Sequence, residues 1–101
     1  MTFSRRVRFT PRGQRGVREV LQYSWRTWND RQRAVYKASL DDAFRRIAGF
    51  SLLGRQRDDV RPGLRSLGVE QHVILYRVDD EEVVVLRVVH ARQDISRLSI
   101  P

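Results

Sequence analysis

The sequence contains no cysteine, only one lysine and no long hydrophobic run. Without cysteine, a disulfide scaffold, a thiol nucleophile and a zinc finger are excluded. No apolar stretch approaches the roughly 20 residues that cross a bilayer, and no apolar segment follows the N-terminus as it does in a signal peptide. We therefore expect a cytoplasmic protein with no membrane-spanning segment.

Internal repeats, low-complexity tracts and linkers are also absent from the 101 residues. A chain of this length is typical of one domain, which we place at residues 1–101, and it can bury one hydrophobic core. The apolar fraction of 41% argues against disorder, because disorder requires low hydrophobicity. We therefore expect a single folded unit.

Acidic residues are scarce in the first half of the chain. Residues 1–50 contain 12 basic and 4 acidic side chains, whereas residues 51–101 contain 8 of each, so the whole net charge of +8 lies in the first half. Lys37 is the only lysine, and the other 19 cations are arginines. A GC-rich genome would explain the preference for arginine but not this asymmetry. A one-sided basic field attracts nucleic acid or an acidic protein partner.

The first half is predicted to form a strand followed by a helix. Residues 5–10 alternate basic and apolar side chains, as a strand does, and Thr10-Pro11 offers an N-cap and a first helical residue. Gly13 and Gly16 should weaken the first turn, so we expect the helix to become regular only near Val17. Its apolar face should contain Val17, Val20, Leu21, Ser24 and Trp28.

A second helix is predicted after Asn29, where Gln32 completes a capping box. This helix should stop at Gly49 and form a helical hairpin with the first. Its buried face should contain Tyr36, Leu40, Ala43, Phe44 and Ile47.

The second half changes to the period of strands. Residues 51–63 have the composition of a loop, and three strands are predicted at 64–69, 72–78 and 83–89. The last strand is apolar on both faces, which is typical of an internal strand covered on each side, and segment 5–10 is its expected neighbour. We therefore predict an α+β fold in the order β-α-α-β-β-β, with the helical hairpin packed on a mostly antiparallel sheet. We expect one core that contains Leu21, Trp28, Leu40, Phe44, Leu86 and Val88.

Few residues offer obvious chemistry. His72 and His90 are the only histidines; they lack partners at metal-ligand spacing and are expected to be structural hydrogen-bonding residues. Trp25 and Trp28 with Tyr23 could stack on bases, but Trp28 continues the apolar face of the first helix, which favours core packing. We predict no metal site and no cofactor.

Three segments resemble one protein family. The run Leu53–Leu67 (LGRQRDDVRPGLRSL) is similar to the signature stretch of ParE-type toxins, the toxin half of bacterial type II toxin–antitoxin pairs in the RelE/ParE superfamily. His72–Val78 and Arg87–Ile95 match two further segments in the same order, so the resemblance covers residues 5–98. Residues 12–16 (RGQRG) depart from it, since relatives usually carry alanine and acidic residues there.

The resemblance implies a RelE/ParE-like fold and a toxin that a cognate antitoxin keeps inert as a hetero-oligomer. In this family the C-terminal segment of the antitoxin covers the helices and the sheet of the toxin. We expect that segment to be acidic, because residues 1–50 are basic. The candidates for contacting antitoxin or target are Arg15, Arg18, Arg26, Arg33, Arg61, Arg65 and Arg92.

The superfamily contains two activities: ParE-type members with a known target poison DNA gyrase, and RelE-type relatives cleave mRNA on the ribosome. RelE-type ribonucleases carry arginine and lysine after the second helix, an arginine early in the middle strand, and an arginine with tyrosine or histidine near the C-terminus. The position that matches the middle-strand arginine is Val73 in this chain. Arg92 matches the late arginine, but residues 93–101 contain neither tyrosine nor histidine. One arginine cannot act as both general acid and general base, so we predict a toxin that poisons gyrase by contact. The alternatives are a ribosome-dependent ribonuclease that uses Arg92 and His90, and a non-toxic module that only binds antitoxin.

Overall fold

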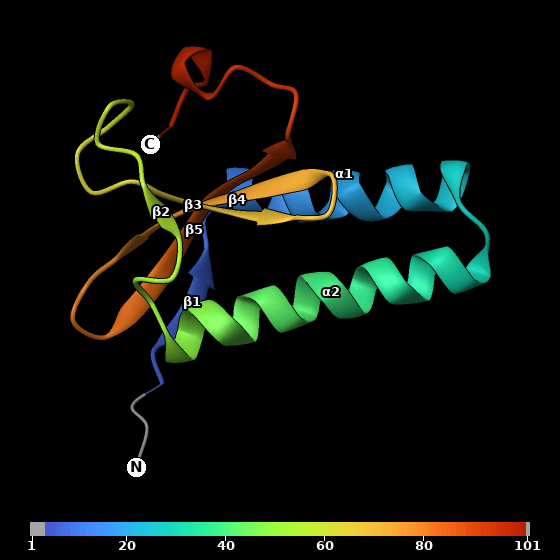
Figure 1. Cartoon of the computed structure of the whole chain (residues 1–101), viewed down its shortest axis with the longest axis horizontal. Helices are drawn as coiled ribbons and strands as arrows, with labels where there is room; N and C mark the ends of the chain where they lie inside the picture. Colours follow the sequence, from blue (N-terminus) through green and yellow to red (C-terminus); the bar gives the residue numbers. More distant parts are fainter. Residues whose placement is uncertain (1–3, 101) are drawn as a thin grey trace.

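A helical hairpin covers one face of a five-stranded sheet in the computed structural model, which describes residues 4–100 (Figure 1). Within these residues, no helix is long and apolar enough to cross a membrane. In chain order the elements are β1 (Arg6–Phe9), α1 (Pro11–Thr27), α2 (Asp30–Gly49), β2 (Arg55–Gln56), β3 (Arg65–Val69), β4 (His72–Val78), β5 (Glu82–His90) and the short 3₁₀ helix η1 (Ile95–Arg97).

The sheet has the strand order β1-β5-β4-β3-β2. β5 pairs in parallel with β1 and antiparallel with β4, and the remaining pairs are antiparallel. The predicted α+β fold, the internal position of the last strand and its pairing with the first are therefore confirmed. The predicted order was incomplete, because β2 lies within the segment expected to be a loop. Its two residues are exposed and carry no alternating pattern that would have marked a strand.

α1 begins at Pro11, and the prediction that it becomes regular only near Val17 is wrong. The Thr10 side chain caps the helix by accepting the Gly13 N–H at 3.0 Å. The two glycines are buried against β5: a Cβ at Gly13 would lie 2.4 Å from the Val85 carbonyl oxygen, and one at Gly16 would lie 2.5 Å from that of Val88. Close helix–strand packing therefore offsets the cost of about 1 kcal/mol that each glycine imposes on a helix.

α2 follows its sequence signals closely. Asn29 and Gln32 form the predicted capping box, and the helix ends at Gly49. Phe44 is only half-buried and packs edge-on against Phe9 with 5.0 Å between ring centroids. The fully buried residues of the predicted face are Tyr36, Leu40, Ala43 and Ile47.

The apolar interior consists of two clusters, so the prediction of one core was wrong. Val88 belongs to the cluster beneath the helices, whereas Leu86 belongs to a second cluster with Leu64 and Ile100. A β-bulge places Leu86 and Val88 on opposite faces of the sheet. Arg87 pairs with Leu75 and Val85 pairs with Tyr76, which leaves Leu86 without a partner on β4 and shifts the alternation of β5. The C-terminal segment that carries Ile100 contributes to the second cluster, which explains why β5 is apolar on both faces.

Candidate functional site

A chain of aromatic contacts runs from the helical hairpin to the start of β4. Trp28 lies between Tyr23 and Tyr36, with ring centroids 5.7 Å and 4.8 Å away, and Tyr36 packs edge-on against His72. The Tyr36 hydroxyl donates to the Val69 carbonyl at 3.2 Å and also contacts Nδ1 of His72. Trp28 is therefore part of the interior, as the sequence suggested, and His72 is a buried, hydrogen-bonded histidine.

Burial sets the protonation of this cluster. Burial raises the pKa of Tyr36 to about 12, with a smaller contribution from the negative charge of Glu70. Burial also lowers the pKa of His72, and the neighbouring His90 lowers it further. The two imidazole rings are cross-strand partners with centroids 5.3 Å apart. Both effects favour the neutral forms of Tyr36 and His72.

Two positions that bear on the ribonuclease alternative, His90 and Val73, lie on different faces of the sheet. His90 packs on His72 beside α1 and α2, and its Nδ1 accepts the backbone N–H of Arg92 at 3.1 Å. Val73, at the position of the middle-strand arginine of ribonucleases, packs against the second cluster. Because successive residues of a strand point to opposite faces, the His90 imidazole and the Val73 position do not face a common substrate.

The seven candidate arginines do not gather into one site. Two of them are engaged within the chain. Arg33 stacks over Trp25 at 4.3 Å, pairs with Asp30 and donates to the Trp28 carbonyl at 2.6 Å, so it holds the α1–α2 turn. Arg65 donates to the Gly54 carbonyl at 2.8 Å. The side chains exposed to solvent or lining a pocket are Arg15, Arg18, Arg26, Arg61 and Arg92.

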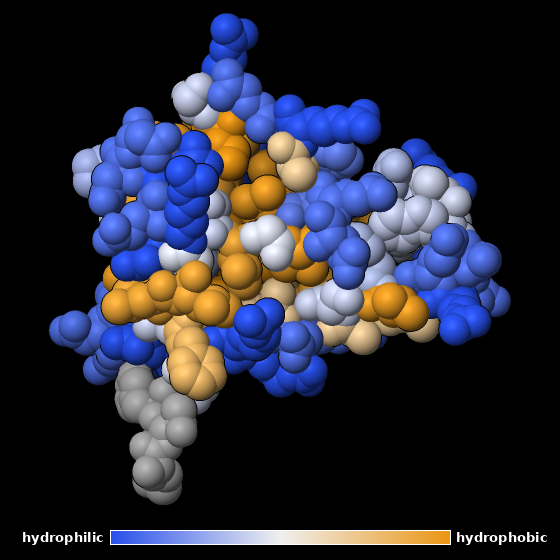
Figure 2. All heavy atoms as spheres, viewed as in Figure 1, coloured by the Kyte–Doolittle hydropathy of each residue, from blue (hydrophilic) through white to orange (hydrophobic). Residues whose placement is uncertain are grey.

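Two groups of exposed apolar side chains were not predicted as a surface. One consists of two separate residues of the helical hairpin, Trp25 of α1, which is 71% exposed, and Val35 of α2, which is 58% exposed. The other follows α2, where Phe50 and Leu52 are 67% and 66% exposed and Leu53 is 40% exposed. Figure 2 shows this second group as an apolar patch over the end of α2. The sequence signal was the set of apolar residues Phe50, Leu52 and Leu53, which follow the predicted end of the second helix and belong to no predicted strand.

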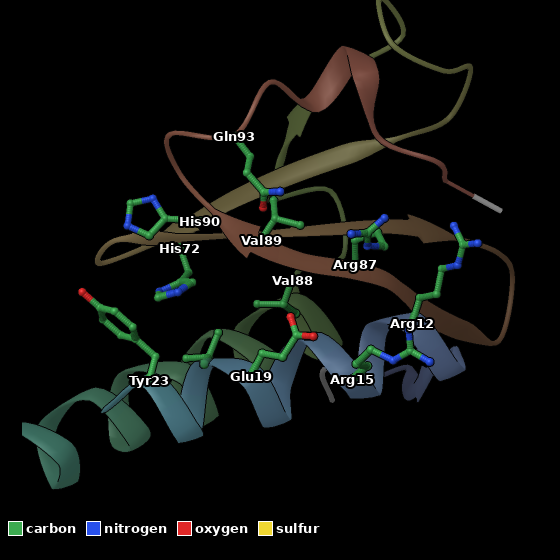
Figure 3. Close-up of a pocket in the computed structure, with 12 residues that line it drawn as sticks. Arg12, Arg15, Glu19, Tyr23, His72, Arg87, Val88, Val89, His90 and Gln93 are labelled. Carbon is green, nitrogen blue, oxygen red and sulfur yellow. The ribbon is translucent and has the colours of Figure 1, made fainter. Parts of the chain in front are cut away.

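A pocket of about 430 Å³ opens between α1 and β5 (Figure 3). Arg15 is the one candidate arginine that lines it, together with His72 and His90. Sequence reasoning missed the site because its residues come from α1, the start of β4 and the end of β5. Within residues 4–100, no group of three or more histidine or acidic side chains is placed to hold a metal ion.

Structural comparison shows that chains of two toxin–antitoxin systems share this fold. The structure superposes on a chain of the chromosomal ParDE TA system from P. aeruginosa with a TM-score of 0.70 and 14% identity, covering 88% of this chain and 98% of that one. It also superposes on a chain of the RelBE2 toxin–antitoxin complex from Mycobacterium tuberculosis, with a TM-score of 0.59 and 29% identity over 86% of this chain and 98% of that one.

Sequence comparison assigns the family. The chain is 34% identical to toxin ParE1 of Mycobacterium tuberculosis over 95 residues, which span 93% of this chain and 97% of the relative. It is 40% identical to toxin ParE3 of Caulobacter vibrioides over 57 residues, but this match spans only 56% of this chain and 57% of that relative. Residues 7–95 match the family described as the ParE toxin of the type II toxin–antitoxin system parDE. The resemblance seen in the sequence is therefore confirmed, and the chain belongs to the ParE toxin family.

Proposed function

We propose that this chain is a toxin that arrests growth by binding DNA gyrase, and that a cognate antitoxin neutralises it by covering the contact surface. Family membership supports the toxin assignment, since residues 7–95 match ParE toxins. The relatives of known structure support the antitoxin, because one comes from a ParDE system and the other from a RelBE2 toxin–antitoxin complex.

The observation that carries the proposal is the exposed apolar surface. Large neighbouring apolar side chains exposed together are typical of protein-binding surfaces, whereas scattered single ones are not. Phe50, Leu52 and Leu53 form such a group after α2, and Trp25 of α1 is a further large exposed apolar side chain. An exposed tryptophan is also the residue type most often responsible for binding energy at an interface. This surface favours binding by contact over chemistry.

The charge of the chain supports a partner that is both apolar and acidic. The net charge of +8 lies entirely in residues 1–50, which include both helices and Trp25. An amphipathic antitoxin segment with acidic residues beside its apolar ones would match this surface in both respects. The partner surface of gyrase should carry the same combination, since toxin and antitoxin binding exclude each other in this proposal.

The test is a DNA-cleavage assay with purified gyrase, supercoiled DNA and toxin freed of antitoxin. We expect the wild-type chain to make gyrase accumulate cleaved DNA, and we expect Leu52→Gln or Trp25→Ala to weaken this effect about tenfold or more if the side chain lies at the centre of the interface. Gln14→Ala is the control, because Gln14 is an exposed, uncharged residue of α1 that belongs to neither apolar group. Cleavage that is unaffected by both apolar substitutions, or absent with the wild-type chain, would contradict the proposal.

A further inference from the structure

The pocket between α1 and β5 has two chemically different ends (Figure 3). Arg12 and Arg15 of α1 and Arg87 of β5 line one end. Aromatic rings line the other end, where Tyr23 of α1 lies near His72 of β4 and His90 of β5. Glu19 and Gln93 lie between the two ends.

Within residues 4–100, no ion pair balances the positive charge of the cationic end. Arg12 and Arg87 both donate through Nη1 to the same carbonyl oxygen, that of Ser99, each at 3.0 Å. A neutral carbonyl does not neutralise two guanidinium groups, and the ion pairs found within residues 4–100 involve none of the pocket arginines. Glu19 is the one acidic residue of the lining. The site therefore holds converging like charges that a bound anion would stabilise.

Guanidinium groups from two elements suit a phosphate better than a single carboxylate. A phosphate offers several acceptor oxygens, and arginine presents planar donor pairs that fit them. Arg12 and Arg87 are already positioned by Ser99, so binding a ligand would order little more of these two side chains. The guanidinium group of Arg15 lines the pocket and makes no side-chain hydrogen bond within residues 4–100, so its donors are available to a ligand.

The aromatic end offers flat surfaces to a base. Tyr23 is 43% exposed, and its ring lies 6.4 Å from that of His72. His90 is partly exposed and stacks edge-on against the same histidine. Bases bind to such aromatic surfaces without requiring a particular sequence. The pocket volume of about 430 Å³ falls within the range of small-ligand sites.

We propose that this pocket binds a nucleotide, with its phosphate on Arg12, Arg15 and Arg87 and its base against Tyr23 and His90. The inference does not rest on gyrase binding, because it uses only the pocket and its lining. A free nucleotide and the 5′-phosphorylated end of a strand carry the same chemistry, and both are ligands of this kind.

The test is calorimetric titration of the purified chain at fixed ionic strength, with NMR of the imidazole protons as a second readout. The probes are AMP, ribose 5-phosphate, inorganic phosphate and a 5′-phosphorylated dinucleotide. The two histidines of the sequence, His72 and His90, both lie at the aromatic end. Their signals therefore report directly on a base bound there.

We expect AMP to bind more tightly than ribose 5-phosphate and to shift the His90 signals. Arg15→Gln should weaken AMP about tenfold or more, since it removes charged hydrogen bonds without disturbing the Ser99 contacts. Tyr23→Ala should weaken AMP but not ribose 5-phosphate. Arg46→Gln makes the same change of charge outside the pocket and should leave AMP affinity unchanged. A dinucleotide that binds more tightly than AMP would identify a strand end as the ligand, and the reverse order would identify a free nucleotide.

Three results would overturn the proposal. Equal weakening by Arg15→Gln and Arg46→Gln would indicate general attraction to a basic protein. Equal binding of AMP and inorganic phosphate, with no effect of Tyr23→Ala, would indicate an anion site without a base. Absence of nucleotide binding, with a glutamate-rich peptide shifting the histidine signals instead, would assign the pocket to an acidic protein partner.

Discussion

The helix-covered face of the sheet carries polar and aromatic groups, whereas the opposite face is apolar and is closed in part by the C-terminal segment. On the first face Tyr36 and His72 are buried with hydrogen bonds, and α1 packs directly on the backbone of β5. On the second face Leu64, Leu86 and Ile100 form a wholly aliphatic cluster. Val73, which the family resemblance matches to the middle-strand arginine of ribonucleases, packs on that aliphatic face. The difference teaches that both faces provide a buried core, whereas the groups suited to binding lie on the helical side.

Both faces should contribute equally to stability if each cluster is a true core. Leu40 is 2% exposed beneath the helices, and Leu64 is 1% exposed in the second cluster. We expect Leu40→Ala and Leu64→Ala each to lower the free energy of unfolding by ~2–5 kcal/mol, measured by urea denaturation. Leu52→Ala is the control and should change it by less than about 0.5 kcal/mol, because Leu52 is exposed. If only Leu40→Ala lowered the free energy of unfolding, the second cluster would not be a core that stabilises the fold.

Close packing against β5 backbone should be a property of the helical face alone. Gly16→Ala places a Cβ 2.5 Å from the Val88 carbonyl oxygen, and we expect a loss of about 1–3 kcal/mol despite the better helix propensity of alanine. Gly68→Ala on β3 is the matched control, since its Cβ would meet no atom within 4 Å. Thermal unfolding of the two variants provides the measurement. A stabilised Gly16→Ala protein would mean that α1 does not approach β5 this closely.

The pH dependence of stability should also come from the helical face. The pKa of His72 is lowered below its ordinary value of 6.5 in the folded chain by burial. The unfolded chain therefore binds a proton first as the pH falls, so the stabilising contribution is complete above pH 6.5 and is lost as the pH decreases toward the folded pKa. His72→Asn should flatten the melting temperature across this range. A wild-type melting temperature that rises as the pH drops below 6.5 would contradict the burial of His72.

The smallest expected effect concerns encounter with an acidic partner. Residues 1–50 hold the whole net charge of +8, so the association rate of an acidic amphipathic antitoxin segment should decrease as salt increases, because salt screens charges separated by more than about 10 Å at 0.1 M. Stopped-flow fluorescence at several salt concentrations measures this rate. An association rate that does not depend on salt would show that the positive charge of residues 1–50 does not attract the partner.

Local signals in the sequence predicted most of the fold. Thr10 and Asn29 cap the two helices as expected, because a cap depends on residues only three positions away. The strand His72–Val78 has the predicted bounds, since its residues favour strands individually. The family was also identifiable from sequence, because three short segments resemble ParE-type toxins in the same order along the chain.

The errors came from contacts between residues far apart in the chain. Gly13 and Gly16 weaken a helix considered alone, and only the backbone of β5 explains why they are there. The bulge at Leu86 depends on pairing with β4, so simple alternation placed Leu86 on the wrong face. At the pocket, Arg12 and Arg87 both donate to the Ser99 carbonyl oxygen, and no local sequence pattern predicts that these two residues meet.

The most direct test of whether this chain poisons gyrase by binding it compares gyrase and ribosome-bound mRNA as targets in parallel. Wild type and Arg92→Ala are each assayed for gyrase-dependent DNA cleavage and for cleavage of ribosome-bound mRNA. We predict that the wild-type chain makes gyrase accumulate cleaved DNA and leaves mRNA intact, and that Arg92→Ala weakens the gyrase effect by no more than an interface arginine does. Codon-specific cleavage of mRNA by the wild type, lost in Arg92→Ala while gyrase is unaffected, would contradict the account.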